Sequence, residues 1–455
     1  MSLAKPTPKR LLPRTLTQQL ERDLQDFPAL VLQGARAVGK TTLGRALVAS
    51  EINLADKAQH SFFVADPAAA LRETEKPVLL DEWQIEPDCL WAIKSLIDDE
   101  GASGFIVAGS ASPPTSDQHL GQFPLTGRAI VRELRSMSKA ERIGKTATPL
   151  ADLMLTNEPE WPLPEELSQR DYVDIALETG YPACVEMQRA ESERYLQGVV
   201  STALQHDIAA AGRQRGGEQF RQAMMGFLRS CALHSGRITS LRAIANHARI
   251  SDRAAAGYQA IFSACHLIED VDVWRPSADS SPAKHPKRIV CDPGMMTVMA
   301  QLQRQRLLAT PMLLGGLMET FVAAQLRSQQ PIATINHSLL TYNHHPRHKQ
   351  DIRYPEGEID FLLESADGSA VAAVEVKTGN RAEPRQAKRM AALRDAIDEK
   401  AREHPPNSPV PPMQFTCGIV LICGQAPIRK IEDRLWIAPM SLLWATPNNH
   451  QIGLF

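Results

Sequence analysis

Gly34-Ala35-Arg36-Ala37-Val38-Gly39-Lys40-Thr41-Thr42 is the stretch that decides the fold of this chain. It fits the pattern G-x-x-x-x-G-K-[ST], in which glycines let backbone N–H groups close around phosphate oxygens. The apolar residues 29–33 ahead of it predict a buried strand, and residues 43–48 behind it predict a helix. The stretch therefore predicts a nucleotide-binding loop, with Lys40 reaching the outer phosphates and Thr41 holding Mg²⁺.

A second motif supports the first. Residues 77–82, Pro-Val-Leu-Leu-Asp-Glu, form an apolar run that ends in two carboxylates. In phosphate-loop enzymes this strand carries the acid that orients Mg²⁺, here Asp81. Glu82 is then the candidate base that positions the attacking water. A further apolar run, residues 105–109, ends at Ser110, which we expect to lie beside the phosphates.

One arginine is a candidate sensor of the γ-phosphate. Arg128 closes the sequence Leu-Thr-Gly-Arg at residues 125–128, after the strand that ends at Ser110. We expect it to act in cis or across a subunit interface of a homo-oligomer, with a ring among the forms expected. The alternative is an ordinary surface arginine.

These motifs together resemble a family of AAA-type ATP-binding proteins of bacteria and archaea that carry a C-terminal domain of uncharacterised function. The shared features are Leu-Pro-Arg at 12–14, the loop at 34–42, Leu-Leu-Asp-Glu-Trp-Gln at 79–84, the runs at 105–112 and 125–141, and the segments 178–182 and 374–377. The family usually has D-E-I-Q where this chain has Trp83 as the third residue. The resemblance implies an AAA-type domain with ATP and Mg²⁺ as its cofactors.

Composition sets limits on the remaining possibilities. The chain has 455 residues, 43% apolar content and a formal net charge of −2, so two to four domains are expected and nucleic-acid binding needs a local basic surface. Seven scattered cysteines without a C-x-x-C pair argue against a zinc site or a disulfide framework. The sequence shows neither a secretory signal nor an apolar run long enough to span a bilayer. We therefore expect a cytoplasmic protein with no membrane partner.

The pattern of the chain predicts an α/β protein with four segments. Residues 1–145 alternate short apolar strands with helices, as expected for an AAA-type P-loop ATPase domain. A proline-rich linker and a helical domain follow at 146–232, then a winged-helix-like domain at 233–300. Residues 301–455 complete the chain as a restriction-endonuclease-like α/β domain.

The winged-helix interpretation rests on two predicted helices and two predicted strands. The helices are residues 241–248 and 252–265, and the strands are residues 266–274 and 288–291. The loop between the strands holds Arg275, Lys284, His285, Lys287 and Arg288, as a DNA-contacting wing would. The second helix offers only Arg253, Tyr258 and Gln259 as readers of bases, so we favour a packing or positioning role.

The last segment carries a second set of candidate residues. Glu319 lies in a helix that begins at Leu317, Asp360 lies on an apolar strand, and Glu375 and Lys377 share one face of the next strand. This arrangement resembles the core of PD-(D/E)XK nucleases. The resemblance implies that the three carboxylates hold Mg²⁺ ions and that the lysine orients water. The alternative is a nuclease-like fold that persists as a binding module.

Basic residues cluster after the second of these strands. Arg381, Arg385, Lys388 and Arg389 lie on or just before a predicted helix, residues 383–403, and are expected to face a phosphate backbone. Two hypotheses remain. The first is an ATP-driven, oligomeric DNA-processing enzyme, with branched or forked DNA among its expected substrates. The second is an ATP-controlled switch or scaffold whose nuclease-like domain only binds a partner or nucleic acid.

Overall fold

The computed structural model divides the chain into two compact units. It describes the following residues: 12–109, 123–156, 158–210, 217–275, 285–344, 354–381, 383–405, 407–408 and 411–446. The first unit comprises residues 1–137, 180–221 and 260–267, and the second comprises residues 138–179, 222–259 and 268–455. The domain boundaries expected near residues 145, 232 and 300 stay predictions.

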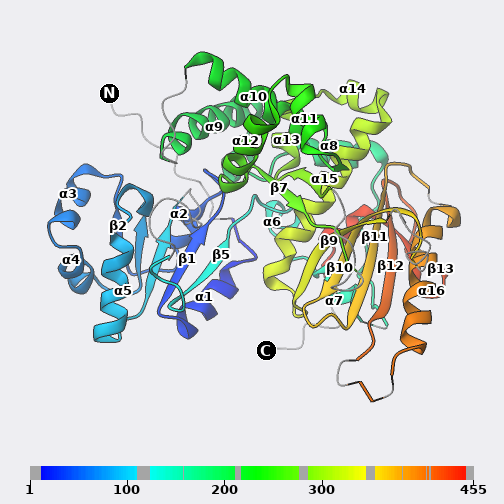
Figure 1. The fold of residues 1–455 in the computed structure, drawn as a ribbon, viewed down its shortest axis with the longest axis horizontal. Coiled ribbons are helices and arrows are strands. Elements are labelled where there is room, and N and C mark those ends of the chain that lie inside the picture. Colours follow the sequence, from blue (N-terminus) through cyan, green and yellow to red (C-terminus); the bar gives the residue numbers. More distant parts are fainter. Residues whose placement is uncertain are drawn as a thin grey trace. The chain divides into compact units, whose positions relative to one another are not determined.

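A parallel sheet of five strands, in the order β2-β3-β4-β1-β5, forms the centre of the first unit (Figure 1). Its strands are β1 (Ala29–Gln33), β2 (Ser50–Asn53), β3 (Val78–Asp81), β4 (Phe105–Ala108) and β5 (Ala129–Glu133). All four residues of β3 and of β4 are buried, as expected for parallel strands covered on both faces. This confirms the α/β fold expected for the N-terminal part. Because β4 lies between β1 and β3, the strand ends of all three meet at one edge of the sheet.

The helices of this unit follow the predicted alternation. They are α1 (Thr17–Asp26), α2 (Lys40–Arg45), α3 (Lys57–Ala65), α4 (Pro67–Glu73), the 3₁₀ turn η1 (Trp83–Ile85), α5 (Cys89–Glu100), the 3₁₀ turn η2 (Pro182–Cys184) and α9 (Arg189–Ala210). α2 ends at Arg45, three residues before the end expected at Val48. Phe63, Trp83, Ile93 and Phe105 are among the residues that form one buried core on a face of the sheet. Across the described residues, every helix is too short or too polar to cross a membrane.

The second unit is built around a six-stranded sheet with the order β13-β14-β12-β11-β10-β9 (Figure 1). Its strands are β9 (His337–His344), β10 (Gly357–Ser365), β11 (Ala370–Lys377), β12 (Gln414–Ile422), β13 (Arg429–Glu432) and β14 (Leu435–Pro439). β9, β10 and β11 are antiparallel neighbours, whereas β11 pairs with β12 in parallel. A parallel pair needs a crossover connection, and α16 (Lys388–Arg402) supplies it. Met390, Leu393 and Ile397 of α16 are buried in the core cluster of this sheet.

Further helices surround this sheet within the second unit. They are α6 (Lys139–Arg142), α7 (Leu150–Met154), α8 (Gln169–Leu177), α13 (Pro293–Ala300), α14 (Arg304–Ala309), α15 (Pro311–Gln329) and the 3₁₀ turns η3 (Gln330–Ile332), η5 (Pro384–Ala387) and η6 (Met440–Trp444). α15 begins at Pro311, six residues before the expected start at Leu317, and proline suits the first turn of a helix. The helix expected from residue 383 begins instead as the 3₁₀ turn η5, with α16 proper starting at Lys388.

Two helices and a small sheet occupy the positions of the expected winged-helix elements. The helices are α11 (Leu241–Ala248) and α12 (Asp252–Ala264), which follow α10 (Glu218–Leu233), and the strands are β6 (Arg237–Ile238), β7 (Ile268–Val271) and β8 (Lys287–Val290). The strand order is β6-β8-β7. One expectation is wrong here: Lys287 and Arg288 do not lie in an exposed wing. They open β8, the central strand, and are buried because acidic side chains from other elements neutralise them.

Candidate functional site

The nucleotide-binding loop connects the end of β1 to the start of α2. Gly34 has φ 144° and Gly39 has φ 101°, backbone conformations that favour glycine. A Cβ atom at Gly34 would lie 2.2 Å from the Leu134 carbonyl oxygen, so no other residue fits there without displacing the chain after β5. The two glycines of the motif are therefore required by the path of the loop.

The side chains after the second glycine join the loop to the neighbouring strand. Lys40 is buried, and its Nζ donates to the carbonyl oxygens of Gly34 at 2.8 Å and Ala35 at 2.9 Å. The Thr41 hydroxyl donates to Asp81 Oδ2 at 2.9 Å. Asp81 ends β3, so the structure brings together residues that lie forty positions apart in the sequence.

These residues fit a magnesium nucleotide. Burial raises the pKa of Asp81, and the charges of Glu82 and Glu51 act in the same direction. A cation beside this carboxylate would offset that effect, and hydroxyl and carboxylate oxygens are the ligands that Mg²⁺ prefers. Thr41 and Asp81 would hold the ion, and Lys40 would hold the outer phosphates. When bound, the ion would neutralise the charge that develops on the phosphates.

Glu82 lies directly after Asp81. It has φ 58°, an uncommon backbone conformation for a residue other than glycine, and its carboxylate accepts a hydrogen bond from the Gln84 amide. A Cβ atom at Gly109, just after β4, would lie 2.4 Å from Gln84 Oε1. Glu82 and Gln84 are thus placed at the edge of the sheet where β3 and β4 end. Ser110 lies outside the described residues.

Arg14 is a residue of this site that the sequence reasoning did not identify. Its guanidinium donates to the carbonyl oxygen of Val38 in the loop at 2.9 Å and to that of Arg135 after β5 at 2.6 Å. It therefore ties the loop to the chain on the other side of β1. The only signal in the sequence was its place in Leu-Pro-Arg at residues 12–14, which carries no role by itself.

Arg128 is not placed beside the loop of its own chain. It precedes β5, where Ala129 pairs with Ala29, whereas the loop follows Gln33 at the other end of β1. Four residues of strand separate the two positions, about 13 Å. The Arg128 guanidinium instead pairs with Asp98 of α5, with Nη2 2.8 Å from Oδ2. This placement gives no support to a cis contact, and the contact across a subunit interface stays a prediction.

The second candidate site is a carboxylate centre in the C-terminal unit, formed by Glu319 of α15 with Glu358 and Asp360 of β10. One carboxylate oxygen of each lies within 4.8 Å of the others. The Nζ atom of Lys287 lies 2.7 Å from Glu319 Oε2, 3.0 Å from Glu358 Oε1 and 3.2 Å from Asp360 Oδ1. Neither Lys287 nor Glu358 was among the predicted site residues.

The other two predicted residues lie next to this centre. The Lys377 ammonium pairs with the Glu375 carboxylate, and the backbone N–H of Val376 donates to Asp360 Oδ2 at 2.8 Å. The pairing of β10 with β9 shifts register between Ile359 and Leu362, the stretch that contains Asp360. All four predicted residues, Glu319, Asp360, Glu375 and Lys377, are therefore brought into one neighbourhood.

The electrostatics of the centre reflect its burial. Burial raises the pKa of Glu319 to about 8 and that of Glu375 to about 7, and the nearby Asp360 charge adds to both shifts. Burial alone would disfavour the charged form of Lys287, but Asp360, Glu319 and Glu358 raise its pKa above the ordinary value. The lysine is therefore a permanent positive charge among the carboxylates.

A divalent metal does not fit the centre in this arrangement. Mg²⁺ needs oxygen ligands in near-octahedral geometry around a shared position. The Lys287 ammonium bonds to all three carboxylates and fills that position. Of the predicted ligands, Glu319 and Asp360 contact Lys287, whereas Glu375 pairs with Lys377. Mg²⁺ binding by Glu319, Asp360 and Glu375 therefore stays a prediction, and we derive no reaction step through a metal here.

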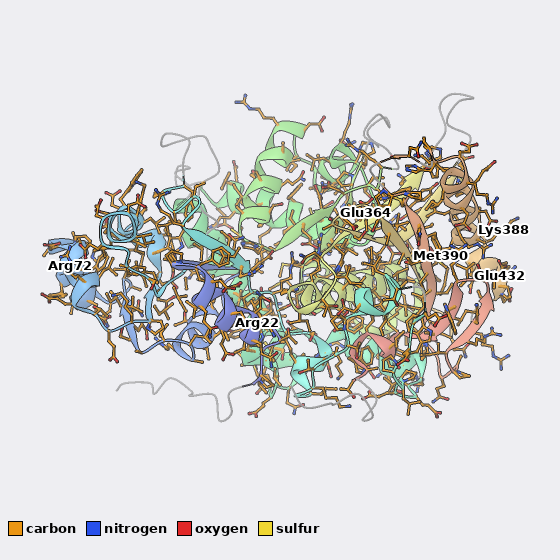
Figure 2. All side chains as sticks on the ribbon, turned by 90° about the horizontal axis from the view of Figure 1, so that it is seen from below. Arg22, Arg72, Glu364, Lys388, Met390 and Glu432 are labelled. Atoms are coloured by element: carbon orange, nitrogen blue, oxygen red, sulfur yellow. The ribbon has the colours of Figure 1, made fainter. Side chains whose placement is uncertain are left out.

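The predicted basic residues that follow β11 divide into two groups. Arg389 donates to the carbonyl oxygens of Glu356 at 3.3 Å and Glu358 at 2.6 Å, so it braces the start of β10. Arg381, Arg385 and Lys388 are exposed, with Arg385 paired to Glu383. Figure 2 labels Lys388 and, two residues on, Met390, which is buried against the sheet.

The candidate base-reading helix α12 offers little to a DNA groove. Tyr258 is buried against Phe227, with ring centroids 6.0 Å apart, and the Gln259 amide donates to Asp270 Oδ2 at 2.6 Å. Of the three predicted readers, only Arg253 is exposed. The structure therefore agrees with a packing or positioning role for this helix.

Comparisons with known families cover three parts of the chain. Residues 26–143 match the model of an AAA domain, residues 169–306 match a domain of unknown function (DUF8612), and residues 314–443 match a domain of unknown function (DUF4143). Residues 26–143 are thus an AAA-type P-loop domain, which confirms the prediction for this part. The two other matches carry no activity, so the winged-helix and nuclease-like interpretations stay predictions.

Two relatives and one solved structure are similar to the chain. Uncharacterized proteins of Mycobacterium bovis and Mycobacterium tuberculosis are each 24% identical over 318 residues, which is 69% of this chain and 65% of the relative. The match thus spans less than two thirds of the length of these relatives. A Walker-type ATPase of Pyrococcus abyssi is similar at a TM-score of 0.38 and 13% identity, covering 65% of this chain and 98% of that one.

Proposed function

We propose that the protein hydrolyses ATP with Mg²⁺ in its AAA-type domain. The observation that carries this proposal is the direct contact between Thr41 and Asp81, which joins the phosphate loop to the acidic end of β3. Glu82, the next residue, is the base that positions the attacking water. Arg14 holds the loop in shape, because it bonds to the Val38 carbonyl within it.

We propose further that the C-terminal unit binds DNA through its phosphates. The chain order α15, β9, β10, β11, α16, β12 supports a nuclease-like arrangement, with Asp360 and Glu375 on neighbouring strands. Exposed Arg381 and Lys388 lie on the segment that follows β11, and Arg389 bonds to the backbone of Glu358 in the carboxylate centre. A basic surface beside this centre suits a phosphate backbone.

For the C-terminal unit, binding is better supported than cutting. Metal-dependent cleavage needs carboxylates that can share a divalent ion, and Lys287 fills that position. This observation favours the second candidate function, an ATP-controlled switch or scaffold whose C-terminal unit only binds nucleic acid or another partner. ATP hydrolysis is common to both candidates and either can bind DNA, so the processing or cutting of DNA is the property that distinguishes them.

Reversing two exposed charges is expected to weaken DNA binding. The variant Arg381→Glu/Lys388→Glu should bind every sequence less tightly, because each side chain contacts phosphates rather than bases. If each makes one phosphate contact, the slope of log K against log salt should fall by about 2. The measurement is fluorescence anisotropy of labelled duplex and forked DNA across a salt series, with ATP hydrolysis measured in parallel.

A matched control for this variant uses two residues near the end of α16, the helix that begins at Lys388. Lys400→Glu/Arg402→Glu makes the same change in net charge on two exposed side chains about 20 Å farther along α16. It should leave the salt slope close to that of the wild type. If the wild type binds no DNA at low salt while it hydrolyses ATP, the partner of the switch is not DNA.

We propose in addition that the chain assembles into an oligomer when nucleotide binds. Arg128 lies at the edge of the sheet opposite the loop of its own chain, so a role at the γ-phosphate requires a neighbouring subunit. We expect light scattering to show an oligomer with a non-hydrolysed ATP analogue. Arg128→Ala should then lower turnover by about 10³-fold or more without loss of ATP binding. A monomer under all nucleotide conditions leaves Arg128 only its pair with Asp98.

A further inference from the structure

We infer that the Lys287 ammonium is the resident cation of the carboxylate centre and stands where a divalent metal would otherwise sit. The wild-type domain then holds no metal at Glu319, Glu358 and Asp360. This inference concerns the C-terminal unit alone, and it does not depend on ATP hydrolysis or on DNA binding.

The contacts of Lys287 match the capacity of an ammonium group. It has three N–H donors, and three carboxylates lie at 2.7, 3.0 and 3.2 Å from its Nζ. The side chain is 0% exposed, so no water competes for these donors. The Phe361 ring lies with its centroid 5.1 Å from the same nitrogen and adds a cation–π contact. The ammonium therefore donates hydrogen bonds to Glu319 and Asp360 and forms a further ion pair with Glu358.

The backbone that carries Lys287 is fixed on both sides. In the central strand β8, Lys287 is opposite Ile238 of β6 and Val271 of β7. The lysine is therefore part of a paired strand, and its backbone cannot swing away without breaking two ladders.

Close packing also fixes this small sheet against α15, the helix that carries Glu319. A Cβ atom at Gly236, the residue before β6, would lie 2.9 Å from the Gly316 carbonyl oxygen and 3.0 Å from Glu319 Cβ. The buried hydroxyls of Ser235 and Thr320 are 2.7 Å apart, and the Ser235 hydroxyl also accepts from Val290 N–H of β8 at 2.9 Å. The distance between Lys287 and Glu319 is thus built into the packing of the unit.

Charge explains why the ammonium excludes a metal. A divalent ion would have to share the space between the carboxylates with the buried ammonium of a lysine whose backbone is held in β8. Two cations a few ångströms apart repel each other, and the repulsion is stronger where water is excluded. Removing the ammonium would instead leave three carboxylates facing one another without a counter-charge. Such a group of hard oxygen ligands takes a divalent ion.

The test uses the full chain without nucleotide and Mn²⁺ as the probe. Lys287→Met keeps an unbranched side chain that is one heavy atom shorter, and it removes the charge. Without Mn²⁺ we expect this variant to unfold at a lower temperature than the wild type. When Mn²⁺ is added, the variant should bind one more Mn²⁺ per chain than the wild type, and its unfolding temperature should rise. Free Mn²⁺ is counted by electron paramagnetic resonance, and unfolding is followed by circular dichroism.

Two controls isolate the centre. Lys400→Met makes the same chemical change at an exposed lysine of the same unit and should match the wild type in Mn²⁺ binding and unfolding temperature. Adding Glu358→Gln to Lys287→Met should remove the gain in Mn²⁺ binding, because one ligand is lost. A folded Lys287→Met protein that gains no Mn²⁺ overturns the inference.

The wild type provides a test that needs no change at Lys287. Wild type and Glu358→Gln should bind the same amount of Mn²⁺, because neither offers the centre to a metal. This comparison remains decisive if Lys287→Met does not fold. The inference would be wrong if the wild type binds an Mn²⁺ ion that Glu358→Gln does not bind. That result would show that the metal displaces the lysine.

Discussion

Lys40→Ala is expected to abolish nucleotide binding, with an affinity loss of more than about 100-fold, or about 2.8 kcal/mol. The buried Lys40 ammonium already bonds to two carbonyl oxygens of the loop, so it is positioned to meet phosphate oxygens at the same place. Its removal takes away both the charge for the phosphates and a support of the loop. The measurement is calorimetric titration of ATP into the nucleotide-free chain with Mg²⁺ present.

An exposed lysine of the same unit provides the control for this change. Lys57→Ala, at the start of α3, should bind ATP as the wild type does. Circular dichroism should show that Lys40→Ala keeps its fold, since the rest of the sheet is untouched. Retained ATP affinity in a folded Lys40→Ala protein would mean that nucleotide binds elsewhere.

Glu82→Gln is expected to separate binding from hydrolysis. The amide keeps the size of the side chain and its contact with Gln84, but it cannot accept a proton from water. Turnover should fall by about 10² to 10⁴-fold, while ATP affinity stays within a few-fold of the wild type. Phosphate release under saturating ATP measures the first quantity, and calorimetric titration measures the second.

The control is a carboxylate that lies away from the loop. Glu73→Gln, on an exposed turn of α4, makes the same chemical change and should leave turnover unchanged. Full turnover by Glu82→Gln would remove Glu82 from the catalytic role and leave the base to another group near the ends of β3 and β4.

The strand, loop and helix around Lys40, and the strand that ends at Asp81, could be predicted because their determinants are local. The loop glycines, Lys40 and Thr41 follow one another, and the apolar run before Asp81 is complete within six residues. Strand order could not be deduced in the same way, because β4 enters the sheet between β1 and β3 although it follows both in the sequence. The hydrogen bonds of Arg14 could not be predicted either, because their two acceptors lie 24 and 121 positions away in the sequence.

The carboxylate centre shows where sequence reasoning fails. Glu319, Asp360, Glu375 and Lys377 became candidates because their order along a helix and two strands resembles the core of PD-(D/E)XK nucleases. Lys287 was assigned to a polar wing, because lysine and arginine in a row usually mark an exposed loop. Its partner Asp360 lies 73 residues away, and only tertiary packing shows that the charge is buried and neutralised.

The most direct test of the ATPase proposal is phosphate release by the wild-type full chain. We predict steady release that requires Mg²⁺, stops with excess chelator, and is absent from Lys40→Ala protein prepared in the same way. The contradicting result is a wild-type chain that binds ATP with Mg²⁺ but releases no more phosphate than the Lys40→Ala protein, with or without DNA. That outcome would make the AAA-type domain a nucleotide-binding module and not an ATPase.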